Sequence, residues 1–241
     1  MTHPILISDQ WFLRPGKSGD AQSSPALKRR GVMGLHCHVP AIDGGFAEID
    51  LARLTSGALR PVVVHVTGDV SRPELTAAWL KKIAASLAGR VSMVELSLAG
   101  SGAYDKPSAA RADVRAGDIL RASIDDFEAA GLMLALRHAH GHWLARIEDS
   151  VRVLMRVNHP QVGVSLSLPD WAKSDGTRLD DRLHLALPRL MNVIIDDQTA
   201  GDEYPGARGL LDRLATLGYI GPVTICPGEK NAGLDEAMRG I

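Results

Sequence analysis

The chain has few cysteines, few signs of a secretory leader and no long hydrophobic run. Only two of its 241 residues are cysteines, Cys37 and Cys226, so the count excludes a disulfide framework. Both lie in apolar runs, where a buried reduced thiol is the usual state. No apolar stretch approaches the roughly 18 residues that a membrane-spanning helix needs. The N-terminal residues show neither a basic region nor a long apolar core. We therefore expect a cytoplasmic protein.

The chain also lacks an excess of positive or of negative charge. Lys and Arg number 27 and Asp and Glu number 28, which gives a formal net charge of -1. This balance excludes a general electrostatic attraction to nucleic acid or to an anionic membrane. Aromatic residues make up only 4% of the chain, so no sugar-stacking platform is indicated beyond Trp11, Trp143 and Trp171. The hydrophobic fraction of 45% is that of an ordinary globular protein.

Short β-rich runs alternate with helical patterns along the whole chain. The candidate strands are Ile5–Ser8, Val32–Cys37, Pro61–Val66, Val91–Leu98, Leu132–Arg137, Val162–Leu168, Leu190–Asp196 and Val223–Cys226. The candidate helices are Ile49–Thr55, Pro73–Ala88, Ala112–Ala130, Ile147–Val157, Asp180–Ala186, Ala207–Leu217 and Leu234–Met238. This alternation, with apolar strands, predicts a parallel sheet covered by helices.

Eight candidate strands in a chain of this length favour a compact (β/α)8 TIM barrel, and we expect one domain over residues 1–241. Residues 11–30 are rich in Gly, Pro and Ser, so the first β/α unit is expected to be irregular. A doubly wound open sheet is the alternative.

Ionisable residues follow most of the candidate strands. In a TIM barrel the functional groups gather at the C-terminal ends of the strands. Six of the nine histidines lie at these ends or in the loops just after them. Imidazole ligates metals and titrates near neutral pH, so this concentration indicates a metal or acid–base centre. In chain order the residues at these ends are Asp9, Trp11, His36, His38, His65, Glu95, Arg137, His138, His140, Asp170, Asp196, Asp197, Cys226 and Glu229.

Four of these residues lie within or at the end of apolar strands. Glu95 is a carboxylate inside the run MVELSLAG, and burying it is costly unless it is paired or ligating. His65 ends a strand just before a Thr-Gly turn, which favours an inward position, although a structural role is equally open. In LHCHVP we expect only one of His36 and His38 to point into the barrel, with the other structural.

The later strand ends give less specific signals. Asp170 follows a proline in SLPDW, which stiffens the turn, and Trp171 is a candidate for a pocket wall. Asp196 and Asp197 follow an apolar strand and suit either a ligand pair or a helix-capping turn. The HAHGH segment at 138–142 has the composition of a metal motif, but its tip equally suits a solvated loop.

The phrases LALRHAHGHW, HPQVGVSLSLPDWAKSDG, LPRLMNVIIDD and LGYIGPVTI resemble one known family. From Leu132 to the C-terminus the chain is similar to the xylose isomerase-like TIM barrels, the sugar phosphate isomerase/epimerase group that includes endonuclease IV. HPQVGVSLSL and LGYIGPVTI carry most of this resemblance. Residues 1–130 match the family only in their strand rhythm and in short motifs such as VVVHVTGD.

The resemblance implies a divalent metal site. Family members commonly hold the metal with a Glu on strand five, an Asp and a His three residues later on strand six, a His on strand seven and a Glu on strand eight. In this sequence these positions fall at Arg137, Ser167, Asp170, near Ile194 and near Cys226. Only Asp170 is suited to ligate, because Arg137 repels a cation and has no lone pair. We therefore expect the usual metal site to be largely replaced.

The resemblance further implies proton abstraction next to a carbonyl, through an enediolate, on a small polar hydroxylated or anionic compound. We expect Glu95 and His65 as base and acid, Arg137 as a clamp for an oxyanion or anion, and Asp170 and His140 as polar support. The substrate-binding candidates are His36, His38, His138, His140, Trp171, Lys173 and Asp196. No cofactor is implied with certainty, and a divalent Mg, Mn or Zn ion on Glu95, Asp170 and His140 is left open.

Two readings of the function remain at this point. The first is an isomerase/epimerase-type enzyme with a small-molecule substrate, no nucleic-acid or membrane partner, and homo-oligomerisation left open. The second is a non-catalytic barrel that binds a small ligand or a protein partner. DNA repair as in endonuclease IV is disfavoured, because the zinc ligands of that chemistry and a basic surface bias are both missing.

Overall fold

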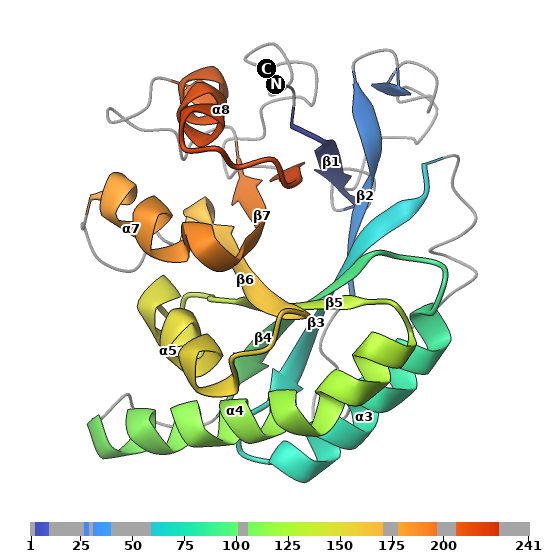
Figure 1. The fold of residues 1–241 in the computed structure, drawn as a ribbon, viewed down its shortest axis with the longest axis vertical. Helices are drawn as coiled ribbons and strands as arrows, with labels where there is room; N and C mark the ends of the chain where they lie inside the picture. The colour runs from blue at the N-terminus through green and yellow to red at the C-terminus, as the bar shows by residue number, and fades with distance from the viewer. Residues whose placement is uncertain are drawn as a thin grey trace, which may run out of the picture.

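The computed structural model describes residues 3–9, 27–28, 31–39, 59–100, 106–170, 178–196 and 206–226. They form a closed barrel of parallel strands in sequential order, with helices packed outside it (Figure 1). The strands are β1 (Ile5–Ser8), β2 (Val32–His38), β3 (Pro61–Asp69), β4 (Met93–Ala99), β5 (Met133–Arg137), β6 (Val162–Ser167), β7 (Leu190–Ile195) and β8 (Val223–Ile225). The helices are α3 (Pro73–Leu87), α4 (Lys106–Ala129), α5 (Ile147–Val157), α7 (Leu179–Ala186), the 3-10 helix η3 (Leu187–Arg189) and α8 (Gly206–Thr216).

The predicted (β/α)8 barrel is confirmed, and the open doubly wound alternative is wrong because β1 pairs in parallel with β8 and closes the sheet. The predicted strands agree with the observed ones to within three residues at either end. The helix expected to begin at Ala112 begins earlier, at Lys106. The first β/α loop and the helices expected at Ile49–Thr55 and Leu234–Met238 lie outside the described residues.

Helix α5 shows how local sequence places the strand that follows it. Its apolar residues, including Val153 and Leu154, recur on one face and are buried against the barrel. At its start the Asp149 carboxylate accepts a hydrogen bond of 3.2 Å from the backbone N–H of Arg146. It ends at Asn158, whose φ of 45° is left-handed and reverses the chain into β6. No described helix is long and apolar enough to cross a membrane.

The interior of the barrel changes from apolar to polar along the strands. Because alternate residues of a strand share a face, Met93 lies on the same face as Glu95, and Ala135 on the same face as Arg137. Near the strand starts, Leu6, Val63, Met93 and Ala135 form a small apolar cluster separate from the larger core between sheet and helices. Two residues further along each strand the inward side chains become polar, so the chemistry of the barrel lies toward the C-terminal ends.

Candidate active site

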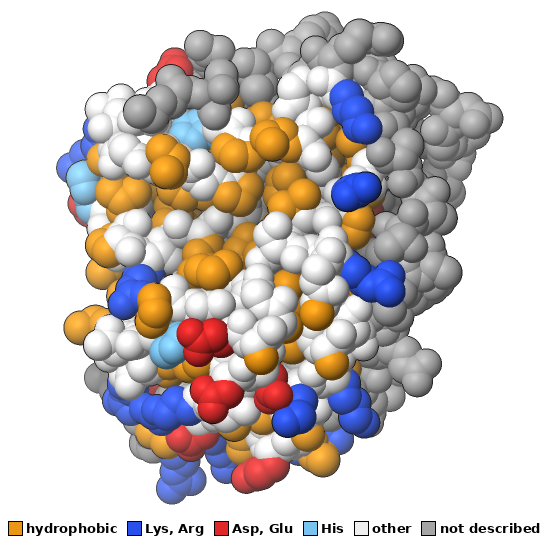
Figure 2. Space-filling model, turned by 45° about the vertical axis from the view of Figure 1, so that its right-hand side comes forward, with side chains coloured by type: hydrophobic (Ala, Val, Ile, Leu, Met, Phe, Trp, Pro, Cys, Tyr) orange, Lys and Arg blue, Asp and Glu red, His pale blue; other side chains and the backbone are white. Residues whose placement is uncertain are grey.

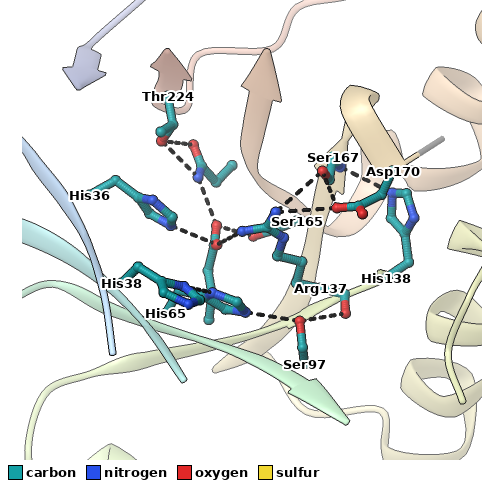
Figure 3. A network of polar contacts seen from close by, with 12 residues as sticks. His36, His38, His65, Ser97, Arg137, His138, Ser165, Ser167, Asp170 and Thr224 are labelled. Carbon is teal, nitrogen blue, oxygen red and sulfur yellow. Dashed lines mark hydrogen bonds and ion pairs between the residues drawn. The ribbon is translucent and has the colours of Figure 1, made fainter. Parts of the chain in front are cut away.

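A polar network lies inside the barrel (Figure 3), and its hydrogen bonds converge on Glu95. Its Oε1 accepts hydrogen bonds from Ser165 Oγ at 2.6 Å and Asn192 Nδ2 at 2.7 Å. Its Oε2 lies 2.8 Å from Nε2 of His36. Asn192 also donates to Thr224 Oγ1 at 3.0 Å, and all of these side chains are buried. Side chains of β2, β6 and β7 thus meet at the carboxylate on β4, and β8 joins the network through Asn192.

The surroundings of Glu95 keep it ionised. Burial on its own would raise the pKa of Glu95, but the charges of His36 and Arg137 and the hydrogen bonds from His36 and Ser165 lower it to about 2. A carboxylate with so low a pKa, and with both oxygens engaged, does not take up a proton near neutrality. Glu95 is therefore an ionised carboxylate whose two oxygens both contact polar side chains of neighbouring strands.

The guanidinium of Arg137 lies between two carboxylates. Its Nη2 donates to Asp170 Oδ2 at 3.2 Å and reaches Ser167 Oγ at 3.5 Å, while Nη1 is 3.9 Å from Glu95 Oε2. Ser167 Oγ also donates to Asp170 Oδ2 at 2.6 Å. Burial would raise the pKa of Asp170, but Arg137, Ser167 and the backbone N–H of His140 outweigh it and lower that pKa. Arg137 and Asp170 thus form a fixed, charged pair at the C-terminal opening of the barrel, which we call the mouth.

His38 and His65 form an imidazole pair beside Arg137. Their Nδ1 atoms are 2.7 Å apart, and His65 Nε2 lies 2.9 Å from Ser97 Oγ. A bond between two ring nitrogens requires one ring to donate and the other to accept. Burial, followed by the charges of Arg137 and His38, holds the pKa of His65 well below its usual value, so His65 is neutral near pH 7.

The expectation that only one of His36 and His38 points into the barrel is wrong. His36 contacts Glu95, and His38 contacts His65, so both histidines face inward. The reason is the two-residue period of a strand, which places residues i and i+2 on the same face. Cys37, between them, faces the opposite way and is buried in the outer core.

His138 and His140 each form a hydrogen bond with a residue near Arg137. His138 Nε2 accepts a hydrogen bond from the backbone N–H of Ser167 at 3.0 Å. Burial lowers the pKa of His138 to about 4, and the Arg137 charge adds to this against the opposing charge of Asp170. His140 contributes its backbone N–H to Asp170 Oδ1 at 3.2 Å, while its side chain is exposed.

The remaining predicted site residues are Asp196, Trp171 and Lys173. Asp196 directly follows β7 and is half-buried. Trp171 and Lys173 lie outside the described residues. Sequence reasoning missed Ser97, Ser165, Asn192 and Thr224, which line the interior. Such residues can be recognised in the sequence as polar residues within an apolar strand that lie two positions from a residue expected to point inward. Ser97 stands in this relation to Glu95.

Comparisons with known proteins identify the fold. No protein-family model and no curated protein matches the sequence. Among solved structures, apo 3-keto-D-glucoside 4-epimerase YcjR from E. coli has a TM-score of 0.72 at 13% identity, covering 99% of this chain and 97% of that one. A D-tagatose 3-epimerase-like protein has a TM-score of 0.70 at 11% identity, covering 98% and 94%. An IolI protein with a bound zinc atom has a TM-score of 0.67 at 13% identity, covering 98% and 94%.

The chain shares the barrel fold of these solved structures. The resemblance of its C-terminal half to the xylose isomerase-like barrels is thus confirmed at the level of the fold, and the likeness extends over nearly the whole chain. At these identities the likeness concerns the fold alone, because one barrel supports many different reactions.

The residues of this barrel do not fit a divalent metal at the position that the resemblance implies. Arg137, Ser167 and Asp170, which stand at three of the implied ligand positions, contact one another, and the first of them is itself a cation. Within the described ranges, no three His, Cys, Asp or Glu side chains are grouped to hold a metal ion. His140 reaches Asp170 through its backbone, so the set Glu95, Asp170 and His140 is not assembled as a ligand group.

Proposed function

We propose that this barrel is an isomerase/epimerase-type enzyme that moves a proton on a carbon next to a carbonyl. The substrate is a small, polar, hydroxylated carbonyl compound bound at the C-terminal mouth, and the intermediate is an enediolate. The observation that carries the proposal is the pair His38 and His65, joined at 2.7 Å, next to the fixed guanidinium of Arg137. A base beside a permanent cation suits enediolate chemistry, because the base takes the proton and the cation stabilises the oxyanion.

The imidazole pair supplies the base. Abstraction of a proton from carbon near pH 7 needs a group that is unprotonated there, and the lowered pKa of His65 meets this condition. Glu95 is also unprotonated but is fully buried, whereas His38 is partly exposed, so we assign proton entry to the His38 side of the imidazole pair. The pair shares one hydrogen between its Nδ1 atoms. In an isomerisation the same pair returns the proton to the neighbouring carbon of the enediolate, whereas an epimerisation requires a second group on the opposite face.

Arg137 supplies the charge that the intermediate needs. Asp170 and Ser167 hold the guanidinium, which carries a fixed positive charge. Its Nε is buried and has no hydrogen-bond partner among the described residues. A buried donor left without an acceptor costs about 1–3 kcal/mol, which an oxygen of a bound substrate would offset. The developing oxyanion is assigned to this guanidinium.

The comparisons support the substrate class by analogy. The 3-keto-D-glucoside 4-epimerase and the D-tagatose 3-epimerase-like protein are both named for sugars that carry a carbonyl. A hydroxylated ligand also suits a mouth built from imidazole, serine and carboxylate groups, each able to bond a hydroxyl.

The test is deuterium incorporation from D2O, which detects proton abstraction whatever the product. The purified protein is incubated with free ketohexoses, 3-keto-glucosides and ketose phosphates, and NMR follows exchange at the carbon next to the carbonyl. We expect exchange with at least one class, reduced about 100-fold or more in His65→Asn and Arg137→Gln. His184→Asn is the matched control, because His184 is exposed on α7 away from the site.

A non-catalytic binding barrel is the second candidate function. It is favoured by one observation, that Arg137 and Ser167 stand at positions implied to hold metal ligands. The same panel separates the two functions through ligand-induced thermal stabilisation. If a compound saturates and stabilises the protein while no member of the panel exchanges deuterium, the enzymatic proposal is refuted in favour of this one.

A further inference from the structure

The guanidinium of Arg137 fills the space between the two carboxylates of the mouth. Nη2 lies 3.2 Å from Asp170 Oδ2, and Nη1 lies 3.9 Å from Glu95 Oε2. Arg137 itself is 16% exposed, Asp170 is 19% exposed and Glu95 is fully buried. The Arg137 side chain, a cation, therefore already lies between Glu95 and Asp170 in a mostly buried space.

The chemistry of this cation excludes a second one. Arginine offers no lone pair to a metal and keeps its charge at any accessible pH. A divalent ion between Glu95 and Asp170 would lie within about 4 Å of that positive charge, where repulsion in a partly buried site is strong. The hydrogen bond from Ser167 to Asp170 further engages the carboxylate oxygen nearest the guanidinium. Asp170 is thus committed to Arg137 and Ser167, and Glu95 faces the same guanidinium at 3.9 Å.

We infer that the side chain of Arg137 takes the place of a divalent metal in this barrel, so that the site carries its cation on the chain. Replacing Arg137 by a carboxylate would then create a site for a hard divalent ion, with oxygen ligands from Glu95 and Asp170. This deepens the proposed function and rests on it only for the role of the cation. Whether Arg137 or a metal ion supplies the positive charge can be measured without any substrate.

The predicted site has a defined geometry. The nearest oxygens of Glu95 and Asp170 already lie within 4 Å of the guanidinium nitrogens. Metal–oxygen distances for such ions are about 2.0–2.6 Å, so shifts of roughly 1 Å would bring these oxygens into range. A glutamate at position 137, on β5, supplies a third oxygen ligand from the same strand end.

The experiment uses Mn2+ as the probe, with free Mn2+ measured by electron paramagnetic resonance after equilibrium dialysis. Wild type is compared with Arg137→Lys, which keeps the charge, with Arg137→Gln, which removes it, and with Arg137→Glu, which adds a ligand. We expect no stoichiometric Mn2+ in wild type or Arg137→Lys. Arg137→Gln is expected to bind at least tenfold more tightly than wild type, and Arg137→Glu at least 100-fold more tightly, at one ion per chain. Adding Asp170→Asn to Arg137→Glu should remove this gain.

Two results overturn the inference. One is a wild-type protein that binds one Mn2+ or Zn2+ per chain as tightly as Arg137→Glu does. The other is equal Mn2+ affinity in Arg137→Glu and Arg137→Gln. If Arg137→Glu fails to give a cooperative melting transition, the comparison of Arg137→Gln with Arg137→Lys decides, and equal affinities refute the inference.

The deuterium assay distinguishes a failure of the inference about Arg137 from a failure of the proposed function. Exchange by wild-type protein that persists in EDTA supports both. Exchange that appears only after a divalent ion is added refutes the inference about Arg137 while the isomerase-type function stands. A metal series that behaves as expected, with no exchange on any substrate class, leaves Arg137 as the cation of the site and refutes the function.

Discussion

Glu95 gives the sharpest prediction, because its surroundings change one measurable quantity, the pKa of its carboxyl group. Its ordinary pKa of 4.5 is lowered to about 2 in the folded protein. A difference of roughly 2.5 pKa units corresponds to about 3 kcal/mol in favour of the ionised, folded state. Glu95→Gln keeps the shape and the acceptor for Ser165 but removes the charge that faces His36 and Arg137. We expect it to lower the free energy of unfolding by about 3 kcal/mol at pH 7.

The pH dependence carries a sign that can be checked. The folded-state pKa of Glu95 is depressed, so its contribution is present above pH 4.5 and is lost as pH falls through 4.5 toward 2. By pH 3.5 about 1.4 kcal/mol of the contribution should be gone. The destabilisation caused by Glu95→Gln should therefore shrink on acidification, since other carboxylates titrate equally in both proteins.

The assay is urea denaturation of wild type and Glu95→Gln at pH 7, 5.5, 4.5 and 3.5, with unfolding free energies extrapolated to water. Glu128→Gln is the matched control, because Glu128 is exposed on α4 and should shift the unfolding free energy little at any of these pH values. A destabilisation by Glu95→Gln that stays constant from pH 7 to 3.5 would refute the account of Glu95 as a charge held by His36 and Arg137.

Two further predictions concern stability. The pKa of His138 is lowered to about 4, so wild type should lose about 2 kcal/mol of stability between pH 7 and pH 5 that His138→Gln does not lose. The urea series above measures this with exposed His184→Gln as control, and a parallel loss in His138→Gln would contradict it. Gly163→Ala should destabilise by about 2 kcal/mol, since its Cβ would lie 2.5 Å from Arg189 O and 2.6 Å from Met191 Cγ. Gly117→Ala, on α4 with only the end of Arg121 nearby, should instead stabilise by up to about 1 kcal/mol, and thermal melts that rank the two glycines the other way would refute this packing argument.

The fold was predictable because its signals are local. Apolar runs bounded by turn residues mark strands, and the stop of α5 at Asn158 and Pro160 is visible in the sequence RVNHP. Regular alternation of such units is enough to specify a parallel barrel. Where the bounds differ, as at the start of α4 at Lys106, the residues KPSAAR carry little hydrophobic periodicity, so the pattern gives no starting point.

The site was only partly predictable, because its contacts join strands far apart in the sequence. Glu95 and Asn192 are 97 residues apart, and no local signal pairs them. The roles expected for Glu95 and His65 also depended on surroundings that the sequence does not show. The carboxylate turned out to be saturated with hydrogen bonds, whereas the histidine is paired with His38. Chemical type was visible at each position, but protonation is set by neighbours.

The identity of the cation at the mouth limits which chemistry this barrel is suited for. A zinc ion lowers the pKa of a bound water to near neutrality and so generates a nucleophile for hydrolysis. A guanidinium does not bind or ionise water in this way, but it stabilises an oxyanion by charge and by directed hydrogen bonds. With Arg137 held between Asp170 and Glu95, the mouth is suited to reactions in which negative charge grows on a substrate oxygen and a proton moves to a neighbouring base. His38 and His65 stand beside it and are the base that we propose, which is why we place proton transfer before hydrolysis.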